Sequence, residues 1–217
     1  LTPVRTAADG TYEFPTVPVG TYELSVDAAA CSQSATRQIT VDGRKIVNFA
    51  LPDVVDAYGY HCEVEAAQYV EGDTALNLSG DDQAVEIELP FPVVHYGARH
   101  TSAFASSNGV LAFDERSTQW TNSALPSSSK PNNAIYPFWD DLSMDGDANL
   151  YTKTIGTAPN RTFVVEWRDA RIRSSSTARL DFEVVFEENG DVTFAYRNID
   201  PENPLERGGS ATIGFEN

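Results

Sequence analysis

The chain has 217 residues, which is enough for one large domain or two smaller ones. Hydrophobic residues make up 41% of it, so it can build a packed core, and wholesale disorder is excluded. Its 32 Asp and Glu residues outnumber 15 Lys and Arg, and the net charge of −17 argues against nucleic acid and anionic membranes as partners while favouring cations.

Strands are predicted along almost the whole chain, because apolar and polar residues alternate. The clearest alternation occurs in 21-TYELSV-26, 85-VEIEL-89, 162-TFVVEW-167, 180-LDFEVVF-186 and 192-VTFAY-196. The last two flank Asn189-Gly190, a turn signal that predicts a hairpin over 180–199. No segment keeps helical spacing over three turns. The sequence therefore predicts an all-β protein of two β-sandwich units.

The boundary between the two units is predicted after Pro52, which cannot donate to a strand ladder, and gives units 1–52 and 53–217. The chain has two cysteines, Cys31 and Cys62, and no CxxC motif. Their number and the secreted-looking composition favour one disulfide; the alternative is two separate buried thiols. If they pair across the boundary, we expect the bridge to hold the two units in a fixed orientation.

Segment 114–133 is rich in Ser, Asn and Pro and is predicted to be a long surface loop. Trp120 within it is either a lid over the sandwich edge or a ligand platform. The aromatic residues that follow are predicted to form a strand, with Tyr136 and Phe138 on one face and Trp139 on the other. If the protein binds glycans, Trp120 and Trp139 are the first candidate platforms.

The acidic segment 140-DDLSMDGDANLY-151 permits two interpretations. Oxygen-bearing residues alternate around Gly146, as in calcium loops, but an EF-hand is excluded because Leu150 and Gly156 occupy the positions of its Gly and Glu. One interpretation is an irregular calcium site, and the other is a polar hairpin turn whose side chains cap their own backbone. The candidate ligands are Asp141, Asp145, Asp147 and Asn149.

No catalytic motif is apparent. The chain has no Gly-x-Ser-x-Gly elbow, no His-Glu-x-x-His and no phosphate-binding glycine loop, and its three histidines form no triad-like pattern. Glycoside hydrolysis needs two carboxyls across a cleft, and Asp140, Asp141 and Glu166 lie near aromatics, but nothing in the sequence determines their separation. We therefore expect a protein that is not an enzyme.

The segment 9-DGTYEFPTVPVGTYELSVDA-28 resembles the carboxypeptidase regulatory-like domain, and 38–52 is similar to its closing hairpin. The resemblance covers residues 1–52 and implies a small, partial Greek-key sandwich of the transthyretin type, whose first strands should precede Leu1. Such an incomplete sandwich exposes strand edges that invite a donated strand. The residues that carry the motif are Asp9, Gly10, Tyr12, Phe14, Val17, Pro18, Gly20 and Tyr22.

A second set of motifs is spread over residues 53–217. Its segments are 56-DAYGYHC-62, 89-LPFPVVHYG-97, 108-NGVLAF-113, 134-AIYPFWDDL-142, 163-FVVEWRDAR-171 and 207-RGGSATIGFEN-217. With these segments, the region resembles the extracellular NIDO-like domain and a module attached to secreted actinobacterial subtilisin-type peptidases. This resemblance implies a larger, jelly-roll-like sandwich that is an appendage and not the catalytic part.

The sequence favours a non-catalytic extracellular binding or spacer region of a secreted or cell-surface protein. Such a region would present a rigid β scaffold for protein or glycan contact, as in cell adhesion, with calcium as its candidate cofactor. One alternative is a subunit of an extracellular filament, completed by a strand from a neighbouring copy. A second alternative is an accessory C-terminal module of a secreted subtilisin-type peptidase.

Overall fold

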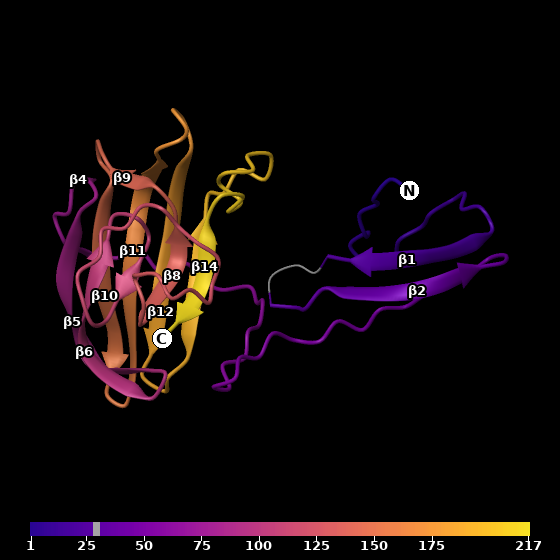
Figure 1. The fold of residues 1–217 in the computed structure, drawn as a ribbon. Helices are drawn as coiled ribbons and strands as arrows, with labels where there is room; N and C mark the ends of the chain where they lie inside the picture. The colour runs from indigo at the N-terminus through magenta and orange to yellow at the C-terminus, as the bar shows by residue number, and fades with distance from the viewer. Residues whose placement is uncertain (28–30) are drawn as a thin grey trace. The chain divides into compact units, whose positions relative to one another are not determined.

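The computed structural model describes residues 1–27 and 31–217 and confirms the all-β prediction (Figure 1). Within the described residues every strand pairing is antiparallel, and no helix is long and apolar enough to cross a membrane. The chain divides into two compact units, unit 1 (Leu1–Ala66) and unit 2 (Ala67–Asn217). The division thus follows Ala66, whereas the sequence predicts it after Pro52.

Unit 1 is built on one antiparallel pair, β1 (Gly20–Val26) and β2 (Ala35–Val41). Along β1 the side chains of Tyr22, Leu24 and Val26 are half-buried, and those between them are exposed. This is the period of two that a strand imposes, so the predicted strand at 21–26 is confirmed.

The predicted disulfide between Cys31 and Cys62 is present. The segment around Pro52 lies against the segment that follows Cys31. The backbone N–H of Val54 donates to the carbonyl of Cys31 at 3.0 Å, and that of Gln33 donates to the carbonyl of Pro52 at 2.8 Å. The expectation that the bridge ties the two units together is therefore wrong, because both cysteines belong to unit 1.

Unit 1 has no buried residue among those that the structure describes. Val19 and Ile46 are 81% and 78% exposed. Because a two-stranded sheet without a core is marginally stable in water, unit 1 depends on the disulfide for its stability. Its sequence separation of 31 residues corresponds to about 3 to 4 kcal/mol in the chain-entropy account.

Unit 2 is a sandwich of two antiparallel sheets (Figure 1). Its strands are β3 (Thr74–Ala75), β4 (Gly80–Asp81), β5 (Ala84–His95), β6 (Ala98–Ser106), β7 (Leu111–Ala112), β8 (Ala134–Trp139), β9 (Leu142–Met144), β10 (Asn149–Thr157), β11 (Asn160–Ile172), β12 (Arg179–Glu187), β13 (Val192–Arg197) and β14 (Thr212–Glu216). The first sheet has the order β13-β12-β11-β10-β3, with β9 paired to β11 and β4 paired to β9. The second has the order β14-β8-β7-β6-β5.

The core of unit 2 lies between its two sheets and is rich in aromatic rings. Trp167 of β11 stacks on Phe182 of β12 with ring centroids 5.0 Å apart, and Phe138 of the opposite sheet lies 5.6 Å from Phe182. The indole N–H of Trp167 donates to the carbonyl of Ser106 in β6 at 2.7 Å. Burying one such side chain contributes about 1.5 to 3 kcal/mol, so this cluster holds the two sheets together.

The predicted hairpin over 180–199 is confirmed. Strands β12 and β13 pair from Asp181↔Arg197 to Phe186↔Val192. Gly190 in the turn has a φ of +109°, a conformation that side chains rarely adopt. The turn signal and the alternating strands therefore specified this element locally.

The prediction for the faces of β8 is wrong. Tyr136 and Trp139 belong to one buried cluster, while Phe138 belongs to the main core. Tyr136 lies opposite Gly214, and Trp139 lies opposite Thr212, so three steps along β8 match two steps along β14. This extra residue is a β-bulge, and a bulge resets the alternation of faces.

Candidate functional sites

The acidic turn between β9 and β10 is held in place by two arginines. Asp145 accepts hydrogen bonds from the guanidinium groups of Arg171 and, at 2.9 Å, Arg179. The hydrogen bond from Arg171 is the main reason that the pKa of Asp145 lies below its ordinary value. Gly146 follows with a φ of +65°, and the N–H of Ala148 donates to the carbonyl of Asp145 at 3.1 Å. The loop is thus a turn in which both carboxylate oxygens of Asp145 accept hydrogen bonds from arginine side chains.

The other three candidate calcium ligands lie in different surroundings. The side-chain oxygen of Asn149 accepts from the backbone N–H of Leu78 at 3.0 Å. Asp141 lies 4.0 Å from the Nε of Arg173, and Asp147 is exposed. Within residues 1–27 and 31–217 no group of three or more His, Cys, Asp or Glu side chains is placed to hold a metal ion. Calcium binding at this loop stays a prediction.

The two candidate aromatic platforms differ in accessibility. Trp139 is 1% exposed and stacks on Tyr136 at 5.1 Å, and its indole N–H donates to the carbonyl of Gln119 at 2.9 Å. The proposal of Trp139 as a platform is therefore wrong, because the ring is covered by the segment between β7 and β8. Trp120, the next residue after Gln119, is 51% exposed. The role of Trp120 as a ligand platform stays a prediction.

A further charged site, which the sequence did not reveal, lies on the outer face of the first sheet of unit 2. Glu166 of β11 and Glu183 of β12 are directly paired across the two strands, and both are fully buried. They are covered by residues 69–72, which we name the strap. The backbone N–H of Val70 donates to Glu183 at 3.0 Å, and that of Gly72 donates to Glu166 at 2.7 Å.

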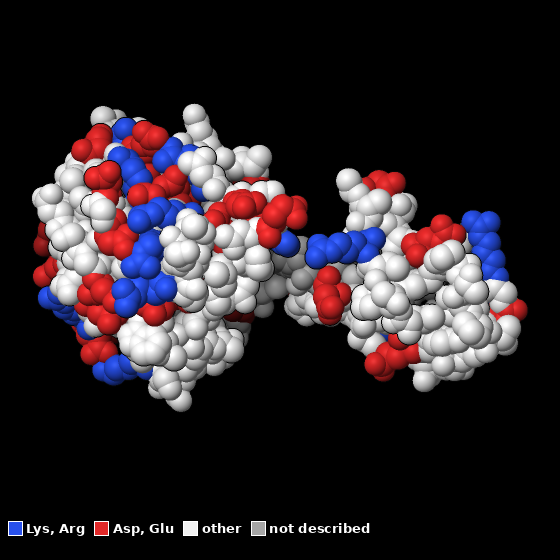
Figure 2. Space-filling view, turned by 90° about the horizontal axis from the view of Figure 1, so that it is seen from above, with Lys and Arg blue, Asp and Glu red and all other residues white. Residues whose placement is uncertain are grey.

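Two arginines complete this site. Arg168 donates to both oxygens of Glu166, at 2.7 and 3.1 Å, and to the carbonyl of Gly72 at 2.8 Å. Arg197 lies 3.7 Å from Glu166 and 4.2 Å from the ring centroid of Tyr69. Figure 2 shows Lys and Arg side chains gathered between acidic ones on one face of the larger unit. Because Glu166 is buried in an ion pair, it cannot serve as one of two glycosidase carboxyls in an open cleft.

A signal for this site does exist in the sequence. Glu166 and Glu183 each interrupt an apolar strand, and a charge in such a strand is buried only when it is paired. The pairing partner is not visible locally, because the strap lies about a hundred residues earlier in the chain. The two glutamates alone therefore leave open whether this outer face is exposed or covered, and the structure shows that the strap covers it.

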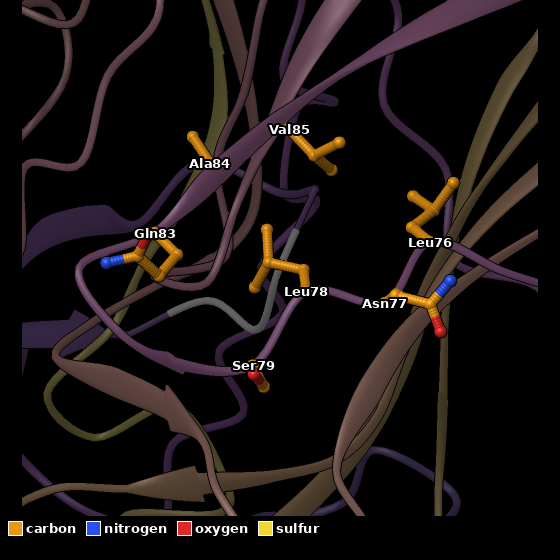
Figure 3. Close-up of a pocket in the computed structure, with 7 residues that line it drawn as sticks. All are labelled: Leu76, Asn77, Leu78, Ser79, Gln83, Ala84 and Val85. Atoms are coloured by element: carbon orange, nitrogen blue, oxygen red, sulfur yellow. The ribbon is translucent and has the colours of Figure 1, made fainter.

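A small pocket opens near the start of β5 (Figure 3). Its volume is about 190 Å³, below the range of roughly 300 to 1,000 Å³ that is typical of small-molecule sites. None of its lining residues has an acidic or basic side chain, and its one hydroxyl group is that of Ser79. The lining residues are Leu76, Asn77, Leu78, Ser79, Gln83, Ala84 and Val85.

Comparison with known proteins places most of the chain in one family. Residues 59–217 match the family model described as NIDO related. The chain belongs to the NIDO-related family. This confirms the resemblance of the larger region to NIDO-like domains.

Two curated relatives of this NIDO-related chain are alpha-tectorins. Over 151 residues it is 26% identical to alpha-tectorin of Mus musculus and 24% identical to alpha-tectorin of Homo sapiens. The matches cover 59% of this chain, and the chain spans about 7% of the length of either relative. No solved structure matches it. Family membership and this similarity fit an extracellular, non-catalytic domain.

Proposed function

We propose that this chain is a non-catalytic extracellular binding and spacer region, in which unit 2 is a rigid scaffold and unit 1 contacts a partner protein. The contrast in burial between the units carries the proposal. All the buried core residues belong to unit 2, whereas the described part of unit 1 has none. Large apolar side chains that unit 1 leaves exposed outside its two strands, such as Val19 and Ile46, are available for a partner to cover.

Site-specific photo-crosslinking tests this proposal. A photoreactive leucine analogue replaces Ile46, which is 78% exposed in unit 1, or Ile155, which is 41% exposed in unit 2. Each full-length protein is then irradiated in the extracellular fraction of its source. We expect adducts with one partner protein at position 46 and none at position 155. Equal labelling at both positions, or no adduct at position 46, contradicts the assignment of unit 1 as the contact region.

A second candidate function is a structural subunit of an extracellular filament, completed by a strand from a neighbouring copy. It is favoured by the two-stranded sheet of unit 1, because within the described residues no further strand pairs with β1 or β2. An open strand edge is a template for strand addition. Sedimentation velocity over a hundredfold range of concentration tests it. Growth of larger species supports the filament, and a monomer throughout rejects it.

A third role, an accessory module of a secreted subtilisin-type peptidase, is supported by the sequence resemblance alone. The secreted or cell-surface location that it requires is consistent with the family match. The coding sequence upstream of Leu1 provides the test. A peptidase domain in the same reading frame supports the role, and its absence there rejects it.

A further inference from the structure

The buried pair Glu166 and Glu183 has an unequal set of partners. Both oxygens of Glu166 are bound by the guanidinium of Arg168. Glu183 accepts one hydrogen bond, from the N–H of Val70, and its second oxygen is buried without a hydrogen-bond partner. A buried, unpartnered carboxylate oxygen is costly, and a proton on it removes the charge that burial disfavours. Geometry alone therefore favours a neutral Glu183 beneath the strap.

The charges that surround Glu183 do not compensate for its burial. Arg197 is shared among Glu71, Asp181 and Glu166, with the last two at 3.5 and 3.7 Å. Burial is the main cause that raises the pKa of Glu183 to about 7, and the charge of Glu166 adds to the rise, against the opposing effects of the Val70 N–H and Arg197. The titratable and charged groups that face this site are Glu166 and Arg168 of β11, Asp181 of β12, Arg197 of β13, Tyr151 of β10, and Tyr69 and Glu71 of the strap.

The strap lies directly on the sheet. A Cβ atom added to Gly72 would lie 2.5 Å from the Cβ of Tyr151 and 3.2 Å from a carboxylate oxygen of Glu166. Only a glycine at position 72 lets the strap backbone approach the sheet this closely. The strap therefore packs directly against the sheet and keeps water away from the carboxyl groups of Glu166 and Glu183. Where the strap lifts, both carboxyls become hydrated, and Glu183 regains its ordinary acidity.

We propose that the strap is a pH-sensitive latch, held on unit 2 while Glu183 is protonated and loosened when Glu183 ionises beside Glu166. The strap is also the first segment after unit 1, which ends at Ala66. Its release therefore lengthens the covalent connection between the two units. The latch would tighten that connection in mildly acidic surroundings and relax it at neutral and alkaline pH.

The direction of the effect follows from linkage. The carboxyl of Glu183 has a pKa near its ordinary value of 4.5 when the strap is open and of about 7 when it is closed. The closed state binds the proton more tightly, so the fraction of open strap rises with pH between those two values and levels off above the higher one. Between pH 5 and pH 8 the opening equilibrium shifts by roughly 70-fold.

Amide hydrogen exchange of the full chain, followed by NMR, tests the latch. The reporters are the N–H groups of Val70 and Gly72, and the controls are those of Val165 and Val184 in the middle of the sheet. After correction for intrinsic exchange rates, we expect protection at both reporters to fall by roughly 70-fold from pH 5 to pH 8, with the control amides staying protected. The variant Glu183→Gln keeps an acceptor but cannot ionise, so its reporters should show no such fall.

Three outcomes would overturn the latch: reporter protection that does not change with pH, the same fall in Glu183→Gln, or a fall that the control amides share. A second variant covers the possibility that Glu183→Gln does not fold. Gly72→Ala prevents the strap from seating without altering either carboxyl, so it should remove protection at Val70 at both pH values and leave Val165 and Val184 protected. Continued protection of Val70 in this variant contradicts a strap seated through Gly72.

Discussion

The substitution Gly109→Ala tests how tightly the turn between β6 and β7 is packed against the core. A Cβ atom at Gly109 would lie 1.9 Å from the carbonyl oxygen of Phe138, and the φ of Gly109 is +69°. Phe138, the second-last residue of β8, is 1% exposed and has no space to retreat. The turn itself must therefore move by more than about 1 Å to reach an ordinary contact distance.

The matched control is Gly146→Ala. Gly146 has nearly the same φ, +65°, but no atom lies within 4 Å of an added Cβ. The left-handed backbone alone costs about 1 to 2 kcal/mol in either variant. At Gly109 the displaced turn adds about 1 to 3 kcal/mol of overpacking. The displacement of the turn also weakens the hydrogen bond from the N–H of Asp140 to the carbonyl of Asn108, which is 3.4 Å long in the wild type. We expect Gly109→Ala to lose about 2 kcal/mol more than Gly146→Ala.

Urea unfolding followed by tryptophan fluorescence measures this difference. All three tryptophans of the chain belong to unit 2, and Trp139 and Trp167 are buried there. The signal therefore reports the unfolding of the unit that contains both glycines. Equal losses of unfolding free energy in the two variants would refute the reasoning, because they would show that the close contact with Phe138 is relieved without cost.

Three further outcomes are expected. Between pH 5 and pH 8 the free energy of unfolding should fall by about 2 to 3 kcal/mol more in the wild type than in Glu183→Gln, because a raised carboxyl pKa stabilises the fold below that pKa and the contribution is lost as pH rises through it; parallel urea profiles would contradict this. Calcium must compete with two arginines at Asp145, so we expect millimolar calcium to raise the melting temperature slightly and EGTA to reverse the rise; an unchanged melting temperature rejects the site. If the protein binds a glycan, Trp120→Ala should weaken its affinity by about tenfold, whereas Ile155→Ala should not; equal affinity of Trp120→Ala and wild type rejects the platform.

Local patterns in the sequence determined the elements whose causes are local. The alternation in 180–186 and 192–196, with Asn189-Gly190 between them, led to the hairpin that the structure contains, because turn chemistry and period decide a hairpin without distant contacts. Composition and the pair of cysteines led to the disulfide. The residues of the larger region carried its family resemblance.

Tertiary structure decided the features that depend on neighbours distant in the chain. Tyr136 and Trp139 share a face because β14 pairs with β8 through a bulge, and no local pattern records a partner strand's register. Asp145 accepts hydrogen bonds from two arginines, Arg171 and Arg179, that lie 26 and 34 residues away, and no local pattern in the sequence records this pairing. Glu166 and Glu183 are buried because the strap crosses them from about a hundred residues away. The type and spacing of a side chain limit the chemistry that it can perform. Burial and charge pairing are properties of the folded structure, and here they determine which carboxyl groups are available to bind a ligand or to change their protonation.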